Sequence, residues 1–172
     1  MEVVRWWQQF SGQAIVGDKT GQELKMLPAR IEAFGLVAKA SPDAQVLVPN
    51  NPRQRRYGDN PYQGYDTSRR PFLFQGDLPD DINPMMRVVA VDDQAWTLPL
   101  LRKRGKIEKG DLVLEWSAGQ NSALDTRKIS KGRDVGNVVV RRRTDVGLVD
   151  VVHHITFAFV FHAFKPKGVL IQ

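Results

Sequence analysis

A serine-containing turn follows a strongly apolar run within Gly110–Asp125. The apolar run leads into Trp116, and short polar side chains follow it. Backbone amides and short side chains at such a strand end are often where a fold presents chemistry. Ser117 or Ser122, with Asp125 and a histidine, would supply the residue types of a hydrolase triad, but no Gly-x-Ser-x-Gly motif surrounds either serine. The turn contains no cysteine, histidine or lysine, so the sequence indicates a place for a site and does not name a reaction.

The second candidate region is a long segment without clear elements, Pro49–Pro84, which holds all three tyrosines. A connection of this length is uncommon in a compact domain and is usually functional. Its candidate binding residues are Tyr57, Asn60, Tyr62, Tyr65 and Asp66. Two interpretations stay open: a packed binding loop, and an ordered connector whose tyrosines seal the edge of the core. A further hypothesis is an enzyme whose cleft lies between the Tyr57–Asp66 loop and the Ser117–Asp125 turn.

Metal and cofactor chemistry find little support in the residue types. The chain has no cysteine, which excludes disulfides, thiolate zinc sites and cysteine nucleophiles within it. His153, His154 and His162 have no carboxylate close by in sequence to orient an imidazole. The glycines are spaced as turn residues and do not form a phosphate-binding motif. We therefore expect no metal and no cofactor.

The chain is basic, with a net charge of +6 and a pI near 9.8. Two of its basic clusters lie at Arg102–Lys109 and Arg141–Arg143. Such clusters can bind nucleic acid or another polyanion through phosphate groups. They can equally form a solvated basic surface at turns and strand ends. No helix-turn-helix, zinc-finger or RNP-like pattern accompanies them.

Apolar periodicity predicts an α+β fold, mostly antiparallel strands with two main helices. Pro28 would begin the first helix, with Ile31, Phe34 and Val37 on its buried face, and Pro42 would end it. The second helix is predicted at Thr156–Phe164. The predicted strands are Trp6–Phe10, Gly12–Gly17, Glu23–Leu27, Gln45–Val48, Met86–Val91, Ala95–Leu98, Leu112–Trp116, Ser122–Thr126, Asn137–Arg142 and Val149–His153.

An internal repeat is suggested by two similar stretches. Leu36–Pro42 followed by Val46–Val48 resembles Val160–Pro166 followed by Val169–Ile171. Each reads as helix, proline and strand, although the match is short enough for chance to remain the alternative. With 172 residues, we expect a single domain over residues 1–172, or two joined halves at 1–84 and 85–172.

No stretch is long and apolar enough to predict a membrane span. The first residues, Met1–Trp6, lack the basic and apolar regions of a signal peptide. As the chain stands, we expect it in the cytoplasm.

Several motifs together resemble a family of bacterial and archaeal proteins, domain of unknown function 3179 (DUF3179). The motifs are Trp6-Trp7-Gln8-Gln9-Phe10-Ser11-Gly12-x-Ala14-x-x-Gly17, Asn60-Pro61-Tyr62-x-Gly64-Tyr65-Asp66, Ser122-Ala123-Leu124-Asp125, and Phe157-x-Phe159 with Ala163-Phe164-x-Pro166. The resemblance covers nearly the whole chain.

The resemblance implies a longer, exported parent protein whose first half carries a Tyr-Cys-Pro-Leu-Cys motif suited to thiol redox chemistry. It implies that this chain is similar to the carboxy-terminal part. By the same resemblance Ser117 and Gln120, after Trp116, occupy the two cysteine positions, and neither can form a disulfide. The functional hypothesis is a non-catalytic structural or binding half, with binding of a polyanion and an enzyme cleft as alternatives.

The expected partners are a second copy of the chain or the amino-terminal half of the parent protein. If half of a duplicated fold is absent, apolar faces lose their cover. We predict that the aromatic start, Trp6, Trp7 and Phe10, is the exposed patch through which the chain self-associates.

Overall fold

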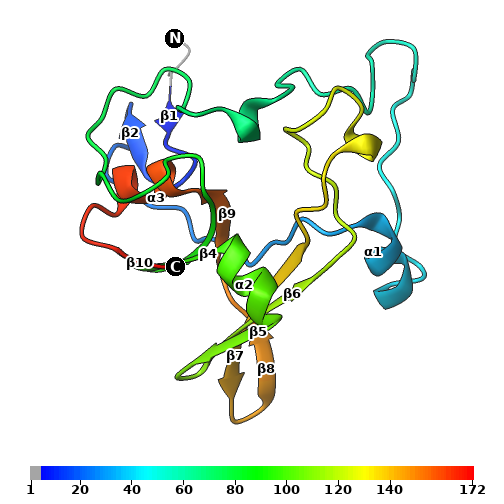
Figure 1. Ribbon diagram of the computed structural model, residues 1–172. Helices are drawn as coiled ribbons and strands as arrows, with labels where there is room; N and C mark the ends of the chain where they lie inside the picture. The colour runs from blue at the N-terminus through cyan, green and yellow to red at the C-terminus, as the bar shows by residue number, and fades with distance from the viewer. Residues whose placement is uncertain (1–4) are drawn as a thin grey trace.

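The structure, a computed structural model, describes residues 5–172. Its elements form one two-stranded and two four-stranded sheets with three seven-residue α-helices (Figure 1). The strands are β1 (Trp6–Trp7), β2 (Ala14–Val16), β3 (Arg87–Val91), β4 (Gln94–Thr97), β5 (Lys106–Lys109), β6 (Leu112–Ser117), β7 (Asn137–Thr144), β8 (Gly147–Asp150), β9 (His154–Phe157) and β10 (Val169–Ile171). The helices are α1 (Phe34–Ala40), α2 (Leu98–Arg104) and α3 (Ala158–Phe164), with 3-10 turns η1 (Tyr65–Thr67) and η2 (Ile129–Lys131). This is an α+β fold, as the sequence predicts.

The first four-stranded sheet has the order β10-β4-β3-β9. The β3–β4 hairpin forms its centre, β9 pairs antiparallel to β3, and β10 pairs parallel to β4. Helix α3 covers one face of the hairpin, where Ala158 and Phe161 pack against Val88, Ala90 and Ala95. The opposite face of β3 joins the main core, so both faces of this strand are buried and its sequence is continuously apolar.

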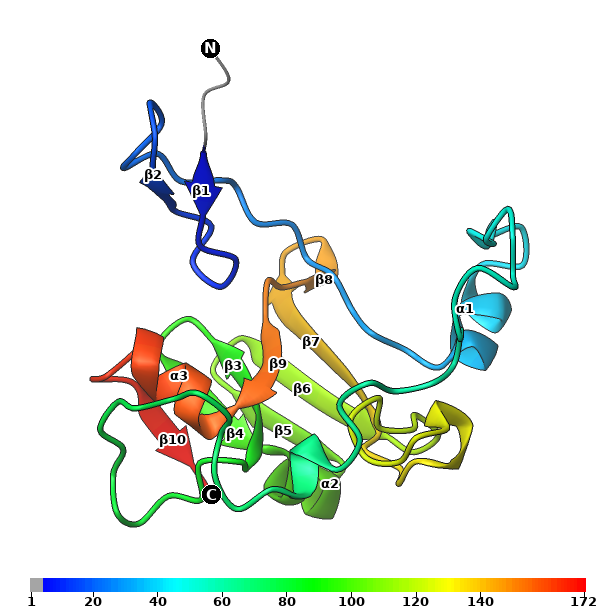
Figure 2. The same cartoon turned by 90° about the horizontal axis from the view of Figure 1, so that it is seen from above.

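The second sheet is an antiparallel meander with the order β5-β6-β7-β8. One face of this sheet packs on the face of the β3–β4 hairpin that is opposite α3, and the two share one core (Figure 2). The buried members of this core are Val89, Val91, Trp96, Leu98, Leu101, Leu112, Leu114, Val138 and Val140. Helix α2 closes one side of it with Leu98 and Leu101, and ends at Gly105, whose positive φ of 70° suits a glycine.

The part of the chain before residue 85 has few elements and little burial. Strands β1 and β2 pair as a short hairpin, and α1 buries none of its residues. The prediction of a helix from Pro28 with a buried face is wrong, because the helix begins at Phe34 and Ile31 is 74% exposed. The predicted buried strand Gln45–Val48 is also wrong: these residues form no strand, and Leu47 is 99% exposed. No sheet lies beneath this segment to receive its apolar side chains.

Other differences have local reasons. Ser122–Thr126 forms a loop rather than a strand, because its polar groups bond to other loops, with the Ser122 hydroxyl donating to Asp66 and the Ser122 amide to the Arg133 carbonyl. Glu23–Leu27 contributes only an isolated bridge from Glu23 to Gln13. Strand β5 was not predicted, because its sequence Lys-Ile-Glu-Lys contains a single apolar residue and so shows no apolar alternation.

The aromatic start of the chain is only partly exposed. Trp6 is 61% exposed. Phe10, however, stacks between the rings of His154 and Phe164, with ring centroids 4.4 and 4.7 Å away. This stacking fixes the β1–β2 hairpin against β9 and α3.

Within residues 5–172, no helix has the length and apolar character that a membrane crossing requires. Met1–Val4, on which part of the prediction about a leader rests, lie outside the described residues.

Candidate functional site

The tyrosine-containing loop and the serine-containing turn meet in space. The amide of Gly64 donates to the carbonyl of Asp125 over 2.7 Å, and the amide of Asn60 donates to the carbonyl of Arg127 over 2.8 Å. The side-chain amide of Asn60 also donates to the carbonyl of Thr126 over 3.3 Å. Two segments separated by more than a third of the chain are therefore held together along their backbones, as the hypothesis of a shared cleft requires.

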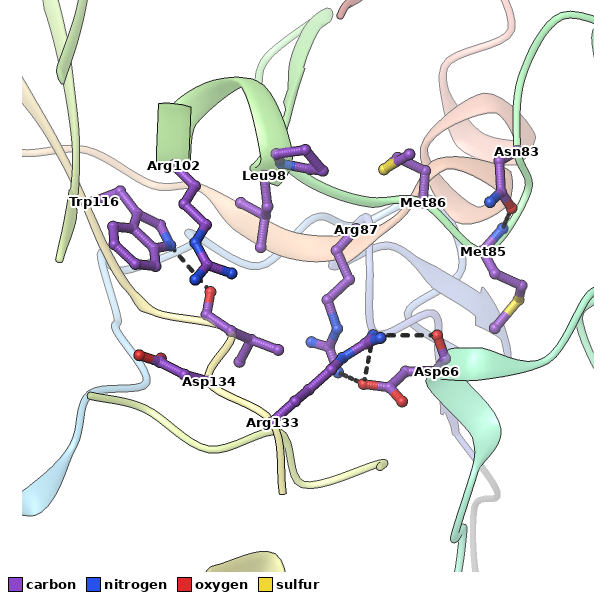
Figure 3. A pocket seen from close by; sticks show the side chains of 12 residues that line it. Asp66, Asn83, Met85, Met86, Arg87, Leu98, Arg102, Trp116, Arg133 and Asp134 are labelled. Carbon is purple, nitrogen blue, oxygen red and sulfur yellow. Dashed lines mark hydrogen bonds and ion pairs between the residues drawn. The ribbon is translucent and has the colours of Figure 1, made fainter. Parts of the chain in front are cut away.

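Asp66 lies at the centre of this junction, with its side chain fully buried. Its Oδ2 accepts hydrogen bonds from the hydroxyl of Ser122 over 2.6 Å and from Arg87 over 3.0 Å. Arg133 approaches the same oxygen to 3.1 Å and donates to the Asp66 carbonyl over 3.3 Å. Figure 3 shows the side chains of Arg87 and Arg133 converging on this carboxylate from different directions.

Burial would raise the pKa of Asp66, but its partners have the larger combined effect. Hydrogen bonds from Ser122 and Arg87, together with the charges of Arg133 and Arg87, lower the pKa of Asp66 below its usual value. The carboxylate is therefore ionised at neutral pH. The Ser122 hydroxyl points its proton at this carboxylate and accepts from Arg87. This arrangement ties two loops together, and a carboxylate with a lowered pKa is a weak general base for a serine nucleophile.

Trp116 closes the other side of the region. Its indole Nε1 donates to the carbonyl of Val135 over 3.1 Å, and the guanidinium of Arg102 lies 5.3 Å from the ring centroid. Gly136 passes so close to the indole that a Cβ there would lie 1.9 Å from Nε1. The backbone after the turn is thus shaped around the tryptophan.

Asp134 organises the turn that follows Trp116. Its carboxylate accepts hydrogen bonds from the amides of Gly119, Gln120 and Gly136, at 2.9, 3.2 and 2.8 Å. Partial burial would raise the pKa of Asp134, but these amides and the charge of Arg102 lower it overall. Asp134 therefore serves as a fixed negative charge beside Trp116.

A cavity of about 360 Å³ separates the Asp66 cluster from Trp116 (Figure 3). Arg87 and Arg102 enter it from β3 and α2, and Arg133 enters from the loop before β7. Half of its twelve lining residues are apolar; its lining is Asp66, Asn83, Met85, Met86, Arg87, Leu98, Pro99, Arg102, Trp116, Arg133, Asp134 and Val135. The cavity has the size and mixed lining of a small-molecule site.

Ser117 and Gln120 flank the bend at the end of β6. Ser117 is exposed, and its carbonyl accepts from the side-chain amide of Asn137 over 3.3 Å. The backbone of Gln120 joins the Asp134 turn, whereas its side-chain oxygen is buried with no hydrogen-bond partner among the described residues. Neither residue lines the cavity.

The remaining candidates have mainly local contacts. Tyr57 and Tyr62 are 54% and 65% exposed, and Tyr65 meets Phe157 edge-on with ring centroids 5.7 Å apart. The carboxylate of Asp125 accepts from the amide of Arg133 over 2.7 Å. Tyr62 and Tyr65 also line a second, open hollow of about 760 Å³.

Sequence reasoning missed Arg87, Arg133 and Asp134 as site residues, and it named Arg102 only as part of the basic cluster Arg102–Lys109. Arg87 carried a usable signal, because it begins an otherwise apolar strand whose two faces are buried by α3 and by the second sheet. Arg133 and Asp134 looked like ordinary turn residues, and only the fold brings them opposite Arg102 and Arg87.

Among residues 5–172, no three histidine or carboxylate side chains gather in a way that could hold a metal ion. His154 packs on Phe10, and its pKa is lowered by burial and by the neighbouring His153.

The basic cluster on β7 is largely paired within the sheet. Arg141 bonds to Glu115, Arg142 lies 3.2 Å from Asp111, and Arg143 lies 2.7 Å from Glu108. These acidic neighbours reduce the positive field that a polyanion would meet.

A family model described as "Protein of unknown function (DUF3179)" matches residues 2–168. No curated protein and no solved structure matches the chain.

Proposed function

The chain belongs to the DUF3179 family, and we propose that it is a non-catalytic half that packs against a second α+β half. The proposed contact surface is the docking segment, residues 34–48. The partner is a half that offers a β-hairpin of the β3–β4 type, with one free strand edge and one apolar face. The observation that carries this proposal is the exposed helix–proline unit, whose counterpart at 158–171 is packed on such a hairpin.

The two helix–proline units share their local geometry. Helices α1 and α3 each have seven residues and end on similar backbone angles, at Ser41 with φ −140° and ψ 79° and at Lys165 with φ −131° and ψ 66°. Each cap residue is followed by a proline. Counted from the helix starts, Phe34 corresponds to Ala158 and Val37 to Phe161.

The surroundings of the two units differ completely. Ala158 and Phe161 of α3 are fully buried, and β10 extends the first sheet by pairing with β4. In the first unit α1 buries nothing, and Val46–Val48 forms no strand. The exposed apolar side chains of this region are Leu27, Ile31, Phe34, Leu36, Val46, Leu47 and Val48. A contiguous stretch of exposed apolar residues is typical of a protein contact surface.

The non-catalytic part of the proposal rests on Ser117 and Gln120. By resemblance they take the positions of the two cysteines in the other half of the family fold, and neither can undergo thiol redox chemistry. The turn that holds them is built around Asp134, with backbone bonds that need no reactive side chain. A structural or binding role for this half, beside a half that carries thiols, is consistent with both observations.

The test uses the chain and, as its probe, the cysteine-bearing half of a longer DUF3179 protein. We expect the two to form a one-to-one complex in light scattering coupled to size exclusion, and the chain alone to self-associate. The double variant Phe34→Ser, Leu47→Ser should lose both associations and keep the melting temperature of the core. The matched control is Leu148→Ser, an exposed leucine on β8 outside the docking segment.

Ser117→Ala and Gln120→Ala should change stability or complex formation and no catalytic turnover. A monomeric wild-type chain that also fails to bind the cysteine-bearing half would overturn the proposal.

A further inference from the structure

We propose that the arginine cavity binds a small organic monoanion, with its carboxylate at the arginines and its apolar body against the apolar side chains of the lining. The proposal concerns the cavity between α2, β3 and the loop before β7, and it does not depend on the docking segment. It rests on the charge balance of the cavity, on its lining and on its shape.

The charge balance favours an anion. Three guanidiniums line the cavity, those of Arg87, Arg102 and Arg133, against the two carboxylates of Asp66 and Asp134. Two of these guanidiniums share one oxygen of Asp66. The lining therefore keeps one positive charge in excess, and a bound monoanion would neutralise it.

The donors of the cavity are not all occupied. The Nε of Arg87 is buried and has no hydrogen-bond partner among the described residues. Arg102 makes no ion pair within residues 5–172 and lies over the Trp116 ring instead. A guanidinium over an aromatic face keeps its N–H groups in its own plane, pointing away from its centre, where they can still bind a carboxylate. Arg102 and the Arg87–Arg133 pair thus offer donors from two sides.

The apolar part of the lining favours an organic anion over an inorganic one. Met85, Met86, Leu98 and Pro99 belong to the lining, with Leu98 beside Arg102 and the two methionines at the end of the cavity away from Trp116 (Figure 3). A sulfate or phosphate would leave this surface in contact with water, whereas an aryl or short alkyl carboxylate would cover it. A volume of about 360 Å³ suits a ligand of that size.

Isothermal titration calorimetry with benzoate and hexanoate tests the proposal. Hexanol serves as the uncharged probe and sulfate as the inorganic one. We expect both carboxylates to bind, and hexanol and sulfate to bind at least tenfold more weakly, about 1.4 kcal/mol. Arg102→Met keeps the stem over Trp116 and removes the charge, so it should weaken benzoate about tenfold.

Arg104→Met is the matched control, since Arg104 ends the same helix and does not line the cavity. It should leave benzoate affinity within about twofold of wild type. Melting temperatures of both variants establish that the fold is intact. Sulfate binding as tight as benzoate, equal loss in both variants, or no carboxylate binding to the wild type would each overturn the proposal.

Discussion

Helix α1 and helix α3 have the same length and the same ending, and only α3 has a sheet beneath it. Ala158 and Phe161 are at 0% exposure, whereas Phe34, the counterpart of Ala158, is 65% exposed. A seven-residue helix is too short to be stable by its own hydrogen bonds in water. The comparison shows that local sequence is enough to set the turn and its end at proline, and that long-range strands decide whether the apolar face is buried.

The largest expected effect comes from replacing one phenylalanine by alanine in each helix. Phe161→Ala should lower the free energy of unfolding by roughly 3–5 kcal/mol, because it opens a cavity between α3 and β3. Phe34→Ala should change it by less than about 0.5 kcal/mol, as for other exposed positions. Urea unfolding followed by circular dichroism measures both. A comparable loss in the two variants would show that α1 is packed in solution.

The same contrast explains how much of the fold could be predicted. Met86–Val91, Leu112–Trp116 and Asn137–Arg142 were close to their observed bounds, since continuous apolar runs with turn residues at both ends are typical of buried strands. Gln45–Val48 carries an equally clear pattern and forms no strand, because it pairs with none of the strands in the described residues. A pattern reports what a segment could bury, and not whether a partner is present.

The candidate site was predicted in a similar, partial way. Asp66 and Trp116 do line the cavity, and the loop and the turn do meet. Arg87 and Arg133 were not predicted as site residues, and Arg102 was placed only in a basic cluster, because the approach of the three arginines depends on the register of two sheets and a loop. Charges that are distant in sequence carry no local signal of their convergence.

A second test asks how firmly the part before residue 85 is fixed to the core. Asp66→Asn keeps the shape of the side chain and removes the charge that Arg87 and Arg133 share. We expect a loss of roughly 2–4 kcal/mol at neutral pH, since two guanidiniums lose their buried counter-charge. Asp18→Asn is the control: its pair with Arg5 is exposed, and its loss should not be measurable.

The pH dependence of stability, compared between the wild type and Asp66→Asn, gives an independent readout. The pKa of Asp66 is lowered in the folded state, so its stabilisation is complete above the unfolded value of about 4 and is lost as the pH falls below it. Thermal melts should show that the wild type loses more stability than Asp66→Asn between about pH 6 and about pH 3. Parallel losses in the two proteins would mean that Asp66 is not a buried, ionised tie.

The smallest expected effect comes from two turns, one in the part of the chain before residue 85 and one in the second sheet. Gly21 and Gly147 have φ values of +87° and +112°, and a Cβ would meet no atom within 4 Å at either position. Alanine therefore introduces backbone strain alone, about 1–2 kcal/mol. The Gly147 hairpin joins β7 and β8 of the second sheet, so Gly147→Ala should lower the global free energy of unfolding by about 1 kcal/mol.

The Gly21 hairpin has one isolated bridge, Gln13 to Glu23, and can open without the core. Gly21→Ala should thus leave the urea midpoint nearly unchanged and instead speed amide hydrogen exchange near residues 14 and 22, which bond across that turn. Equal shifts of the midpoint would show that the first hairpin unfolds together with the sheets.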